Sequence, residues 1–327
     1  EVVLGELPEE MLDSLDLVVL SPGVPTDLPV VLKMKEKEIP VIGEVELAYT
    51  FGKGDVLAIT GTNGKTTTKE LLAAVLSTKF NLLYTEGNFN NHIGVPLTLL
   101  RLTHDHEMAV IEMGASHPGD IKELVDIVHP NYGIITNVGR AHLEGFGSFE
   151  GVIRTKGELY DYIRRSKGKI FIKKENEYLQ SIAKGIEQIT YGNGDDAFAS
   201  GQVVSCDPFL VFNWKQQGKL HTVETHMIGS YNLDNVLAAV AVGRFFKIPA
   251  ERISRAIAAY EPTNNRSQFK KTENNELIID AYNANPSSMK VALDNFITMP
   301  VQPKAIILGD MRELGPTSDE LHAEVVE

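Results

Sequence analysis

One short stretch, AITGTNGKTTT at residues 58–68, constrains the fold of this chain more than any other. It follows an apolar run and precedes KELLAAVL, so a strand is expected to become a helix there. A glycine-rich turn at such a junction directs backbone N–H groups inward, and the helix N-terminus adds partial positive charge. The stretch therefore predicts a phosphate-binding loop. Its residues are Gly61, Thr62, Asn63, Gly64, Lys65, Thr66 and Thr67.

The spelling of this loop differs from the common phosphate-binding pattern, G-x-x-x-x-G-K-[ST]. That pattern requires glycine at position 59, where this chain has Ile59. Lys65 is still placed to reach terminal phosphates, and the Thr66 hydroxyl is placed to hold Mg²⁺. The alternative is a glycine-rich turn without a ligand, which the flanking strand and helix disfavour.

The composition is that of an ordinary globular protein, with 43% hydrophobic and 23% charged residues among 327. The net charge of −13, from 31 basic and 44 acidic residues, disfavours a general binder of nucleic acids or anionic membranes. The single cysteine, Cys206, permits no internal disulfide and favours a reducing, cytoplasmic compartment. No apolar run approaches the length of a membrane span. The first residue is Glu1 rather than Met, so we expect the natural N-terminus to lie upstream.

Alternating strand and helix patterns predict an α/β fold with a parallel sheet. A first alternation covers residues 16–51, and a second begins at residue 55 and enters the phosphate-binding loop. From residue 168 to about residue 228, short strands with turn signals predict a β-rich excursion. After two helices and the polar linker EPTNNRSQF, the alternation restarts. Its expected elements are a strand at 276–282, a helix at 286–296, a strand at 304–310 and a helix from 319.

These patterns divide the chain into three units, at residues 1–52, 53–262 and 263–327. The two outer units are short for α/β domains, at roughly half the usual size.

Polar residues at the ends of predicted strands are the next candidates for a site. Glu112 ends an apolar strand, at the carboxyl edge where open α/β sheets bind ligands, and a carboxylate there suits Mg²⁺. A solvated charge or a helix cap is about as good an interpretation. His142 follows another strand in a glycine-flanked loop, and its place at the same edge favours a metal ligand. Lys156 lies near the start of a predicted helix, where most lysines are solvated.

Four further stretches carry amides, hydroxyls or charges whose meaning the residues alone leave open. The segment YTEGNFNNHIGVPLTLL, with Thr85, Asn88, Asn90 and Asn91, either binds a polar ligand or forms turns of its own. Asn232 and Asn235 lie on one face of a helix start, suited to a cap or to a nucleobase edge. Arg266 could clamp a phosphate, and Asp280, at a strand end, could bind ribose hydroxyls. For the first stretch, composition alone favours turns of its own, and for the other three ordinary turn chemistry is an equally good explanation.

Taken together, these stretches closely resemble one family, the Mur ligases of bacterial cell-wall synthesis. The resemblance covers about residues 70–327 in many ordered motifs and is highly specific. It also accounts for Ile59, because this family lacks the first glycine of the common loop. The motifs are TGTNGKTTT, EGNFNNHIGVPLTLL, VIEMGASHPGDI, ITNVGRAHLEGFGSFEGVIRTKGEL, YNLDNVLAA, NRSQ, DAYNANPSSM and LGDMRELG.

The resemblance implies a three-domain architecture and a substrate class. A central domain with an ATPase-type parallel sheet would lie between a UDP-binding domain and a Rossmann-like ligase domain, both partial here. The motifs are most similar to the members that add D-Ala-D-Ala to UDP-N-acetylmuramoyl-tripeptide. The N-terminal stretch instead resembles the members that add D-glutamate, whose Ser-Pro-Gly turn, here Ser21, Pro22 and Gly23, lies in the UDP-binding domain. We therefore expect a chimera or a fragment.

The resemblance also assigns roles to individual residues. Lys65 would contact the ATP phosphates, and Asn232, Arg266 and Asp280 would bind the rest of the nucleotide. The stretch from Thr85 to Asn91 would line the muramoyl-peptide site. Lys65, His142 and Lys156 would be catalytic. The ligands of two Mg²⁺ ions would be Thr66, Glu112, His142 and a carbamylated Lys156.

The implied reaction is ATP-dependent amide formation through an acyl phosphate, with ADP and phosphate as products. A monomer is the family expectation. Two alternatives stay open: a ligase that adds D-glutamate, and a fragment that binds ATP without catalysis.

Overall fold

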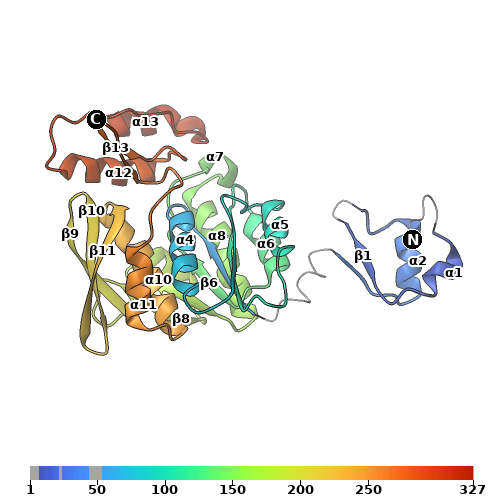
Figure 1. Ribbon diagram of the computed structural model, residues 1–327. Helices are drawn as coiled ribbons and strands as arrows, with labels where there is room; N and C mark the ends of the chain where they lie inside the picture. The colour runs from blue at the N-terminus through green and yellow to red at the C-terminus, as the bar shows by residue number, and fades with distance from the viewer. Residues whose placement is uncertain (1–6, 22–23, 44–53, 327) are drawn as a thin grey trace.

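The computed structural model describes residues 7–21, 24–43 and 54–326 (Figure 1). The N-terminal segment forms a small unit that Figure 1 shows apart from the rest of the chain. Its strands pair in parallel, with Val18 opposite Val41, and α2 buries Val31 and Met34. Its elements are α1 (Glu9–Leu12), β1 (Val18–Leu20), α2 (Pro29–Glu36) and β2 (Val41–Gly43). Pro22, Gly23 and the last part of the first expected alternation, residues 44–51, lie outside the described residues.

The central unit is built on a nine-stranded sheet in the described part of the chain, in the order β11-β10-β9-β8-β7-β6-β3-β5-β4. The pairs from β4 to β9 are parallel, and β9, β10 and β11 pair antiparallel. The strands expected as a β-rich excursion thus extend the central sheet itself. The strands are β3 (Asp55–Thr60), β4 (Leu82–Tyr84), β5 (Met108–Glu112), β6 (Tyr132–Ile135), β7 (Lys169–Lys173), β8 (Glu187–Gly192), β9 (Ala199–Cys206), β10 (Phe209–Gln216) and β11 (Lys219–Ile228).

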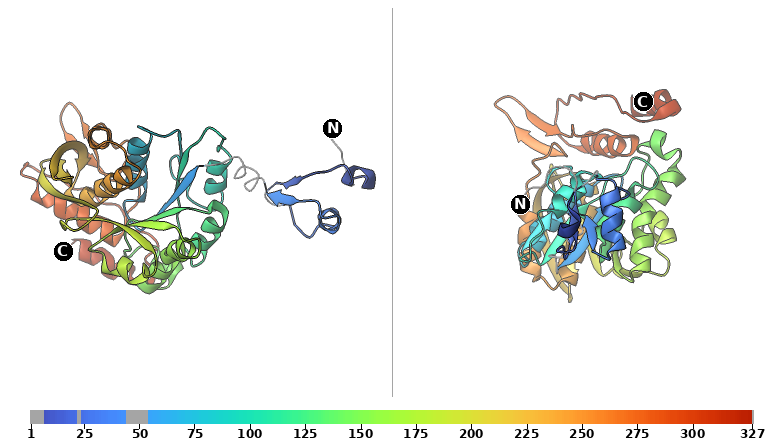
Figure 2. Two further views of the ribbon diagram at one scale, coloured as in Figure 1. Left: turned by 90° about the horizontal axis from the view of Figure 1, so that it is seen from below. Right: turned by 90° about the vertical axis from the view of Figure 1, so that its right-hand side faces the viewer.

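Helices cover both faces of this sheet, as the parallel strands require. Successive residues of β3 alternate between two cores: Leu57 and Ile59 pack with α4, α10 and α11, while Val56 and Ala58 pack with α5, α6 and α8 (Figures 1 and 2). The helices are α4 (Lys65–Leu76), α5 (Gly94–Leu99), α6 (Asp120–Val128), α7 (Leu143–Phe146), α8 (Phe149–Arg165), α9 (Glu177–Ile182), η1 (Ser230–Asn232), α10 (Leu233–Phe245) and α11 (Ala250–Ala258). The expected α/β class with a mostly parallel sheet is confirmed.

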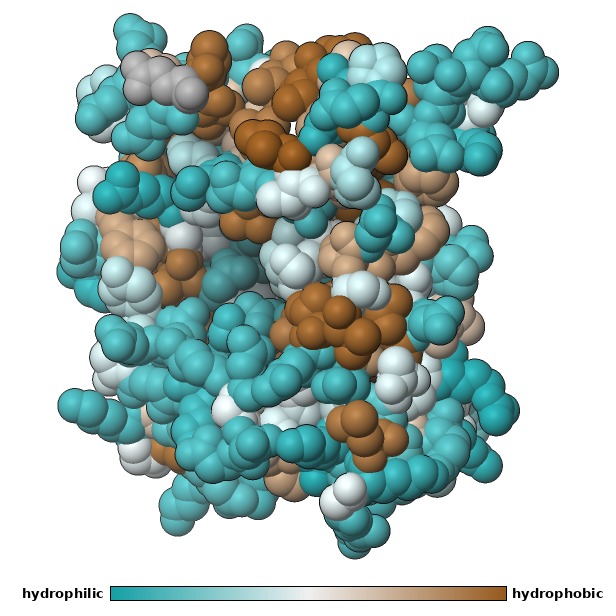
Figure 3. Space-filling view, turned by 90° about the vertical axis from the view of Figure 1, so that its left-hand side faces the viewer, coloured by the Kyte–Doolittle hydropathy of each residue, from teal (hydrophilic) through white to brown (hydrophobic). Residues whose placement is uncertain are grey.

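The C-terminal unit lies across one end of the central unit, next to α7 (Figure 1). It contains an antiparallel hairpin and two helices that contact each other. Figure 3 shows apolar side chains at the top of the molecule, where this unit lies, and a second apolar patch below the middle. Its elements are β12 (Gln268–Lys271), β13 (Glu276–Ile279), α12 (Pro286–Thr298), η2 (Gly315–Thr317) and α13 (Ser318–Val326).

One expected strand of this unit does not form. Residues 304–310 carry no strand, and Ile307 is 97% exposed. A strand needs a neighbour to take up its backbone N–H and C=O groups. Among the described residues β13 pairs only with β12, and residues 304–310 pair with no strand. This apolar run therefore forms no strand despite its high β-propensity.

The described residues include no helix that combines the length and the apolar character needed to cross a membrane.

Candidate functional site

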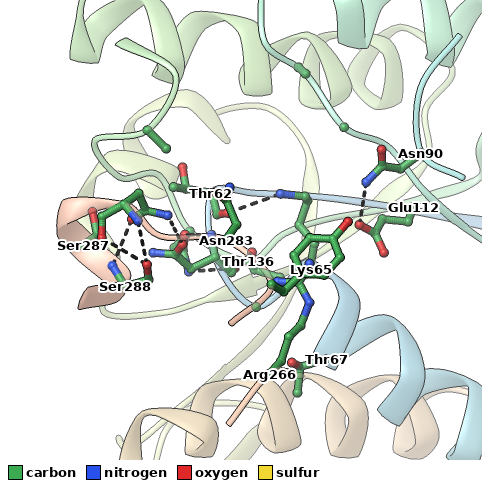
Figure 4. A pocket seen from close by; sticks show the side chains of 18 of the residues that line it. Thr62, Lys65, Thr67, Asn90, Glu112, Thr136, Arg266, Asn283, Ser287 and Ser288 are labelled. Carbon is green, nitrogen blue, oxygen red and sulfur yellow. Dashed lines mark hydrogen bonds between the residues drawn. The ribbon is translucent and has the colours of Figure 1, made fainter. Parts of the chain in front are cut away.

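A cavity of about 790 Å³ lies between the carboxyl edge of the central sheet and the C-terminal unit. The loops that follow β3, β5 and β6 line one side, and residues from 266 to 291 line the other. Figure 4 shows Arg266 approaching Lys65 from the opposite side of the cavity to Asn90 and Glu112. The topology thus places the predicted phosphate-binding loop at the edge where open α/β sheets bind their ligands.

Two glycines allow the phosphate-binding loop to take its shape. Gly61 has φ of +147°, and a Cβ there would lie 1.9 Å from Thr136 Oγ1. Gly64 has φ of +74°, and a Cβ there would lie 2.5 Å from Asn235 Oδ1. The loop leads into α4, whose first turn has no side-chain cap. The first N–H groups of a helix lack partners within the helix, so this end presents donors for an anion.

The Lys65 side chain folds back onto its own loop. Its Nζ donates to the carbonyl oxygens of Gly61, at 2.7 Å, and Thr62, at 3.3 Å. Burial lowers the pKa of Lys65; the charge of Glu112 opposes this effect and that of Arg266 adds to it. A polyphosphate in the cavity would favour the charged ammonium.

Glu112 combines burial with an unused oxygen. The residue is 1% exposed, and its Oε1 accepts hydrogen bonds from Thr66 Oγ1, at 3.2 Å, and Asn90 Nδ2, at 2.9 Å. Its Oε2 is buried and has no hydrogen-bond partner. A buried carboxylate oxygen without a partner is costly, and hard cations such as Mg²⁺ take carboxylate and hydroxyl oxygens. Glu112 and Thr66 therefore fit a Mg²⁺ site.

His142 lies at the start of α7 and lines the cavity. It adopts a left-handed backbone conformation, with φ of +51°. Its Nδ1 is hydrogen-bonded to a carboxylate oxygen of Glu313, in the C-terminal unit. The ring also contacts Phe146 edge-on, with 6.2 Å between the ring centroids.

Lys156 is placed differently from the sequence-based expectation. The helix α8 begins at Phe149, with Ser148 as its cap, so Lys156 lies in the middle of the helix and not near its start. The side chain is buried, with Nζ 5.6 Å from the centroid of the Phe146 ring, and it is not among the residues that line the cavity. Burial, and then the charge of Lys65, hold the pKa of Lys156 well below its usual range. A solvated lysine is thereby excluded.

Asn232 lines the cavity, and its side-chain amide already forms two hydrogen bonds within the chain. Its Nδ2 donates to the carbonyl of Ile228, and its Oδ1 accepts from Asn235 Nδ2, both at 2.8 Å. An amide offers two N–H donors and two lone pairs, so one of each remains for a ligand. Asn235 is held in turn by Thr68 Oγ1, which donates to Asn235 Oδ1 at 3.0 Å.

The structure brings Arg266 and Asp280 to the same cavity. The Arg266 guanidinium stacks 3.8 Å from the centroid of the Tyr282 ring. Asp280 accepts a hydrogen bond from Ser267 Oγ at 3.2 Å, and burial raises its pKa. The Ser267 hydroxyl also forms a hydrogen bond with the Tyr231 hydroxyl, at 2.6 Å. Through Ser267, Asp280 at the end of β13 is thereby linked to the central unit.

The predicted peptide-binding residues separate into two groups. Asn90 and Asn91 line the cavity, whereas Asn88 is exposed outside it. Thr85 is fully buried, and its Oγ1 accepts the backbone N–H of Glu112 at 2.9 Å, so it supports Glu112 and does not face the cavity. Ser21 belongs to the N-terminal segment and is not among the residues that line the cavity.

Several residues that hold the phosphate-binding loop were missed by the sequence analysis. Asn137 Oδ1 accepts the backbone N–H of Asn63 at 2.9 Å, and Thr136 Oγ1 donates to the Asn63 carbonyl at 2.7 Å. Both residues follow β6 at the carboxyl edge of the sheet. Their place in the site could therefore be predicted from the sequence in the same way as that of Glu112. Asn285 Nδ2 donates to Asn63 Oδ1 at 2.9 Å, across 222 residues of sequence, and no local signal marks that contact.

Comparison with known proteins agrees with this architecture. Residues 59–243 match the family model of the Mur ligase middle domain, and residues 265–327 match that of the Mur ligase glutamate ligase domain. A UDP-N-acetylmuramoyl-tripeptide–D-alanyl-D-alanine ligase of Bacillus subtilis is 36% identical over 274 residues, which are 82% of this chain and 59% of that protein. The chain thus spans about three fifths of the length of this relative.

A second relative extends further toward the N-terminus. A UDP-N-acetylmuramoylalanine–D-glutamate ligase of Lachnoclostridium phytofermentans is 31% identical over 318 residues, 94% of this chain and 66% of that protein. Among solved structures, the MurF ligase of Thermotoga maritima in complex with ADP has a TM-score of 0.78 at 25% identity. The matched region is 95% of this chain and 78% of the Thermotoga chain. A family model thus matches more than half of the chain, in line with its motifs, and the chain belongs to the Mur ligase family.

Proposed function

We propose that this chain carries an ATP-dependent ligase centre that joins D-Ala-D-Ala to a UDP-N-acetylmuramoyl-tripeptide. One observation carries the proposal: a single cavity is lined by the phosphate-binding loop of the central unit and by Arg266 and Asp280 of the C-terminal unit. The name of the Bacillus relative supports this acceptor, and the ADP complex of the Thermotoga neighbour supports a nucleotide.

In this proposal ATP spans the cavity from its phosphate end to its base end. The N-terminus of α4 and Lys65 bind the phosphates, and Arg266 approaches them from the C-terminal unit. The free donor and lone pair of Asn232 suit the adenine edge, and Asp280 suits the ribose hydroxyls. Asn90 and Asn91, next to Glu112, orient the peptide substrate.

We propose that Thr66, Glu112, His142 and a carbamate on Lys156 hold two Mg²⁺ ions. The unpartnered Glu112 Oε2 beside the Thr66 hydroxyl supports this assignment. Bound there, Mg²⁺ would neutralise charge on the phosphoryl group during its transfer.

The proposed reaction has two displacement steps, each of which forms one bond and breaks another. A terminal carboxylate oxygen of the tripeptide attacks the γ-phosphorus of ATP, and ADP leaves. The amine of D-Ala-D-Ala then attacks the carbonyl carbon of the acyl phosphate, loses a proton, and phosphate leaves. Lys65 and Arg266 supply fixed positive charge toward the transferring phosphoryl group, the kind of preorganised stabilisation on which such reactions depend.

The surroundings of Lys156 support the proposed carbamate. Burial and Lys65 favour the neutral amine, whose lone pair adds to the carbon of CO₂ with release of one proton. The product is an anion with two oxygens, suited to a hard cation. A buried neutral amine thereby becomes an anionic group that attracts the metal.

Two other functions compete with this one. The Lachnoclostridium relative, which also covers the N-terminal segment, favours D-glutamate as the acceptor. A chain that binds ATP without forming an amide is the other alternative. In either ligase case we propose a cytoplasmic location, since the nucleotide substrates are cytoplasmic, and a monomer, as the resemblance to the family implies.

Phosphate release distinguishes these alternatives. The chain is incubated with ATP and Mg²⁺, and with either UDP-N-acetylmuramoyl-tripeptide and D-Ala-D-Ala or UDP-N-acetylmuramoyl-alanine and D-glutamate. We expect release with the first pair only, and tripeptides with lysine or diaminopimelate at position three then define the peptide. Release with the second pair only would assign the D-glutamate reaction. ATP binding without release in either case would indicate a non-catalytic chain.

A further inference from the structure

The contact between His142 and Glu313 joins the two units of the molecule at the edge of the cavity. His142 belongs to the central unit and lines the cavity, whereas Glu313 belongs to the C-terminal unit and does not. Their hydrogen bond uses His142 Nδ1. The other ring nitrogen, Nε2, is therefore the one that remains for a ligand in the cavity.

Backbone and apolar contacts hold Glu313 in this place. The neighbouring side chains of Met311 and Leu314 are buried in a small cluster with Leu321, and Leu143 of α7 packs against that cluster. The backbone N–H of Glu144 also donates to the Glu313 carbonyl, at 3.4 Å. The loop that carries Glu313 is thus seated on α7 independently of the carboxylate.

The loop is also anchored within its own unit. The backbone N–H of Met311 donates to His322 Nε2 at 3.0 Å, and His322 Nδ1 lies 2.8 Å from the Ser318 carbonyl. These contacts fix the loop to α13. The position of Glu313 relative to His142 is therefore set by how the whole C-terminal unit docks on α7.

Both members of the pair have an unusual backbone. His142 has φ of +51° and Glu313 has φ of +60°, in the left-handed region that residues other than glycine seldom adopt. Such conformations persist where surrounding contacts determine them, and they are frequent at functional sites. Here the two residues meet in one contact between units.

A carboxylate on one ring nitrogen of a histidine has a defined effect on the other. It sets the tautomer, fixes the ring orientation and makes the free nitrogen a better metal ligand. We propose that Glu313 is a positioning residue for His142, so that docking of the C-terminal unit completes the metal site of the central unit. This inference rests on the proposed role of His142 as a metal ligand.

The test uses the full chain with Mn²⁺ and ADP. Pulsed electron paramagnetic resonance detects a histidine nitrogen bound to Mn²⁺, and titration calorimetry measures Mn²⁺ affinity. We expect a nitrogen coupling in the unaltered chain that is absent in His142→Ala. In Glu313→Ala the coupling should weaken, and affinity should fall about 10-fold or more. Glu313→Gln keeps a hydrogen-bond acceptor and should recover part of the loss.

Glu320→Ala is the matched control, because it removes the same charge from the exposed surface of the same unit. It should leave coupling and affinity unchanged, and thermal unfolding of each variant confirms that it is folded. A coupling and an affinity that persist in Glu313→Ala would overturn the inference and leave the proposed function intact. Absence of nitrogen coupling in the unaltered chain would overturn both the metal role of His142 and the inference.

Discussion

Among single residues, two charged side chains that line the cavity could form additional contacts with a charged ligand. Lys65 donates to two carbonyls of its own loop, and Glu112 keeps one buried oxygen free. Each arrangement is ready to exchange these contacts for those of a charged ligand. The consequences can be tested by changing one side chain at a time.

Lys65→Ala should abolish turnover while the fold stays intact, because the glycines and not the lysine shape the loop. Loss of one preorganised contact to a transferring phosphate typically costs ~3 kcal/mol or more in the transition state, so turnover should fall at least ~100-fold. Phosphate release measures this, and circular dichroism checks the fold. Wild-type turnover in Lys65→Ala would show that the nucleotide site is wrongly placed.

Lys156 offers a test of carbamylation. Lys156→Ala should be nearly inactive, and short carboxylic acids should partly restore its turnover by occupying the vacated space. Lys156→Arg should stay inactive, since guanidinium keeps its charge and forms no carbamate. ¹³C magnetic resonance with labelled bicarbonate should show a carbamate signal that both variants lose. A fully active Lys156→Arg would rule out the carbamate.

Lys69 carries a stability prediction at the same scale. Its side chain is fully buried, with Nζ 2.7 Å from the Thr85 carbonyl and 2.6 Å from Glu70 Oε1. Lys69→Met leaves these acceptors without a donor, which should cost about 2 kcal/mol or more in the free energy of unfolding.

Urea unfolding measures that free energy. Lys122→Met is the control, because Lys122 pairs with Asp126 on the exposed surface of α6 and should change stability by less than ~0.5 kcal/mol. Equal effects of the two substitutions would show that burial of Lys69 contributes nothing.

At the scale of elements, the junction of β3 and α4 depends on helix α10 behind it. The Asn235 side chain occupies the space that a Cβ at Gly64 would need. The phosphate-binding loop is therefore shaped from outside its own sequence.

Gly64→Ala tests this dependence. A left-handed conformation costs an alanine about 1–2 kcal/mol, and the contact with Asn235 should add to that cost. Gly218, with φ of +78° and nothing within 4 Å of its Cβ position, provides the control, since Gly218→Ala carries the backbone cost alone. Urea unfolding should show the larger loss for Gly64→Ala, and calorimetry should show weaker ADP binding in that variant only. Equal losses and intact ADP binding would contradict this account.

In the whole molecule, the central and C-terminal units share one site and are joined by a short linker. Asn285 reaches Asn63, Glu313 reaches His142, and a small apolar cluster includes Leu143. The linker between the units contains two residues with positive φ, Asn265 and Ser267. Such a joint suits a closing motion around a ligand.

Limited proteolysis should report this closure. Without ligand we expect cleavage in the linker at residues 261–267 and early loss of the C-terminal unit, while the central unit resists. ADP with Mg²⁺ should slow linker cleavage, because the proposed nucleotide site includes residues of both units. Mass spectrometry locates the cuts, and a nucleotide-free sample with Mg²⁺ alone is the control. Equal cleavage rates with and without ADP would exclude closure around this ligand.

The elements of the central unit and the places of its charged residues could be predicted from the sequence alone. Short continuous apolar runs predicted β3 and β5, the glycines predicted the turn before α4, and strand ends placed Lys65 and Glu112 at one edge of the sheet. Those features depend on spacing within a few residues, which the sequence displays directly. The motifs added the Mur ligase family, which the family models confirm.

Which distant residues meet could be learned only from the folded chain. It paired Asn285 with Asn63 and Glu313 with His142, buried Thr85 and Lys156, and left residues 304–310 without a strand. Each of these outcomes depends on a neighbour from another part of the chain: a partner for a polar group, a cover for a side chain, or an adjacent strand for a backbone. Local propensity contains no information about such neighbours, so it predicts the parts of the site and not the contacts that assemble it.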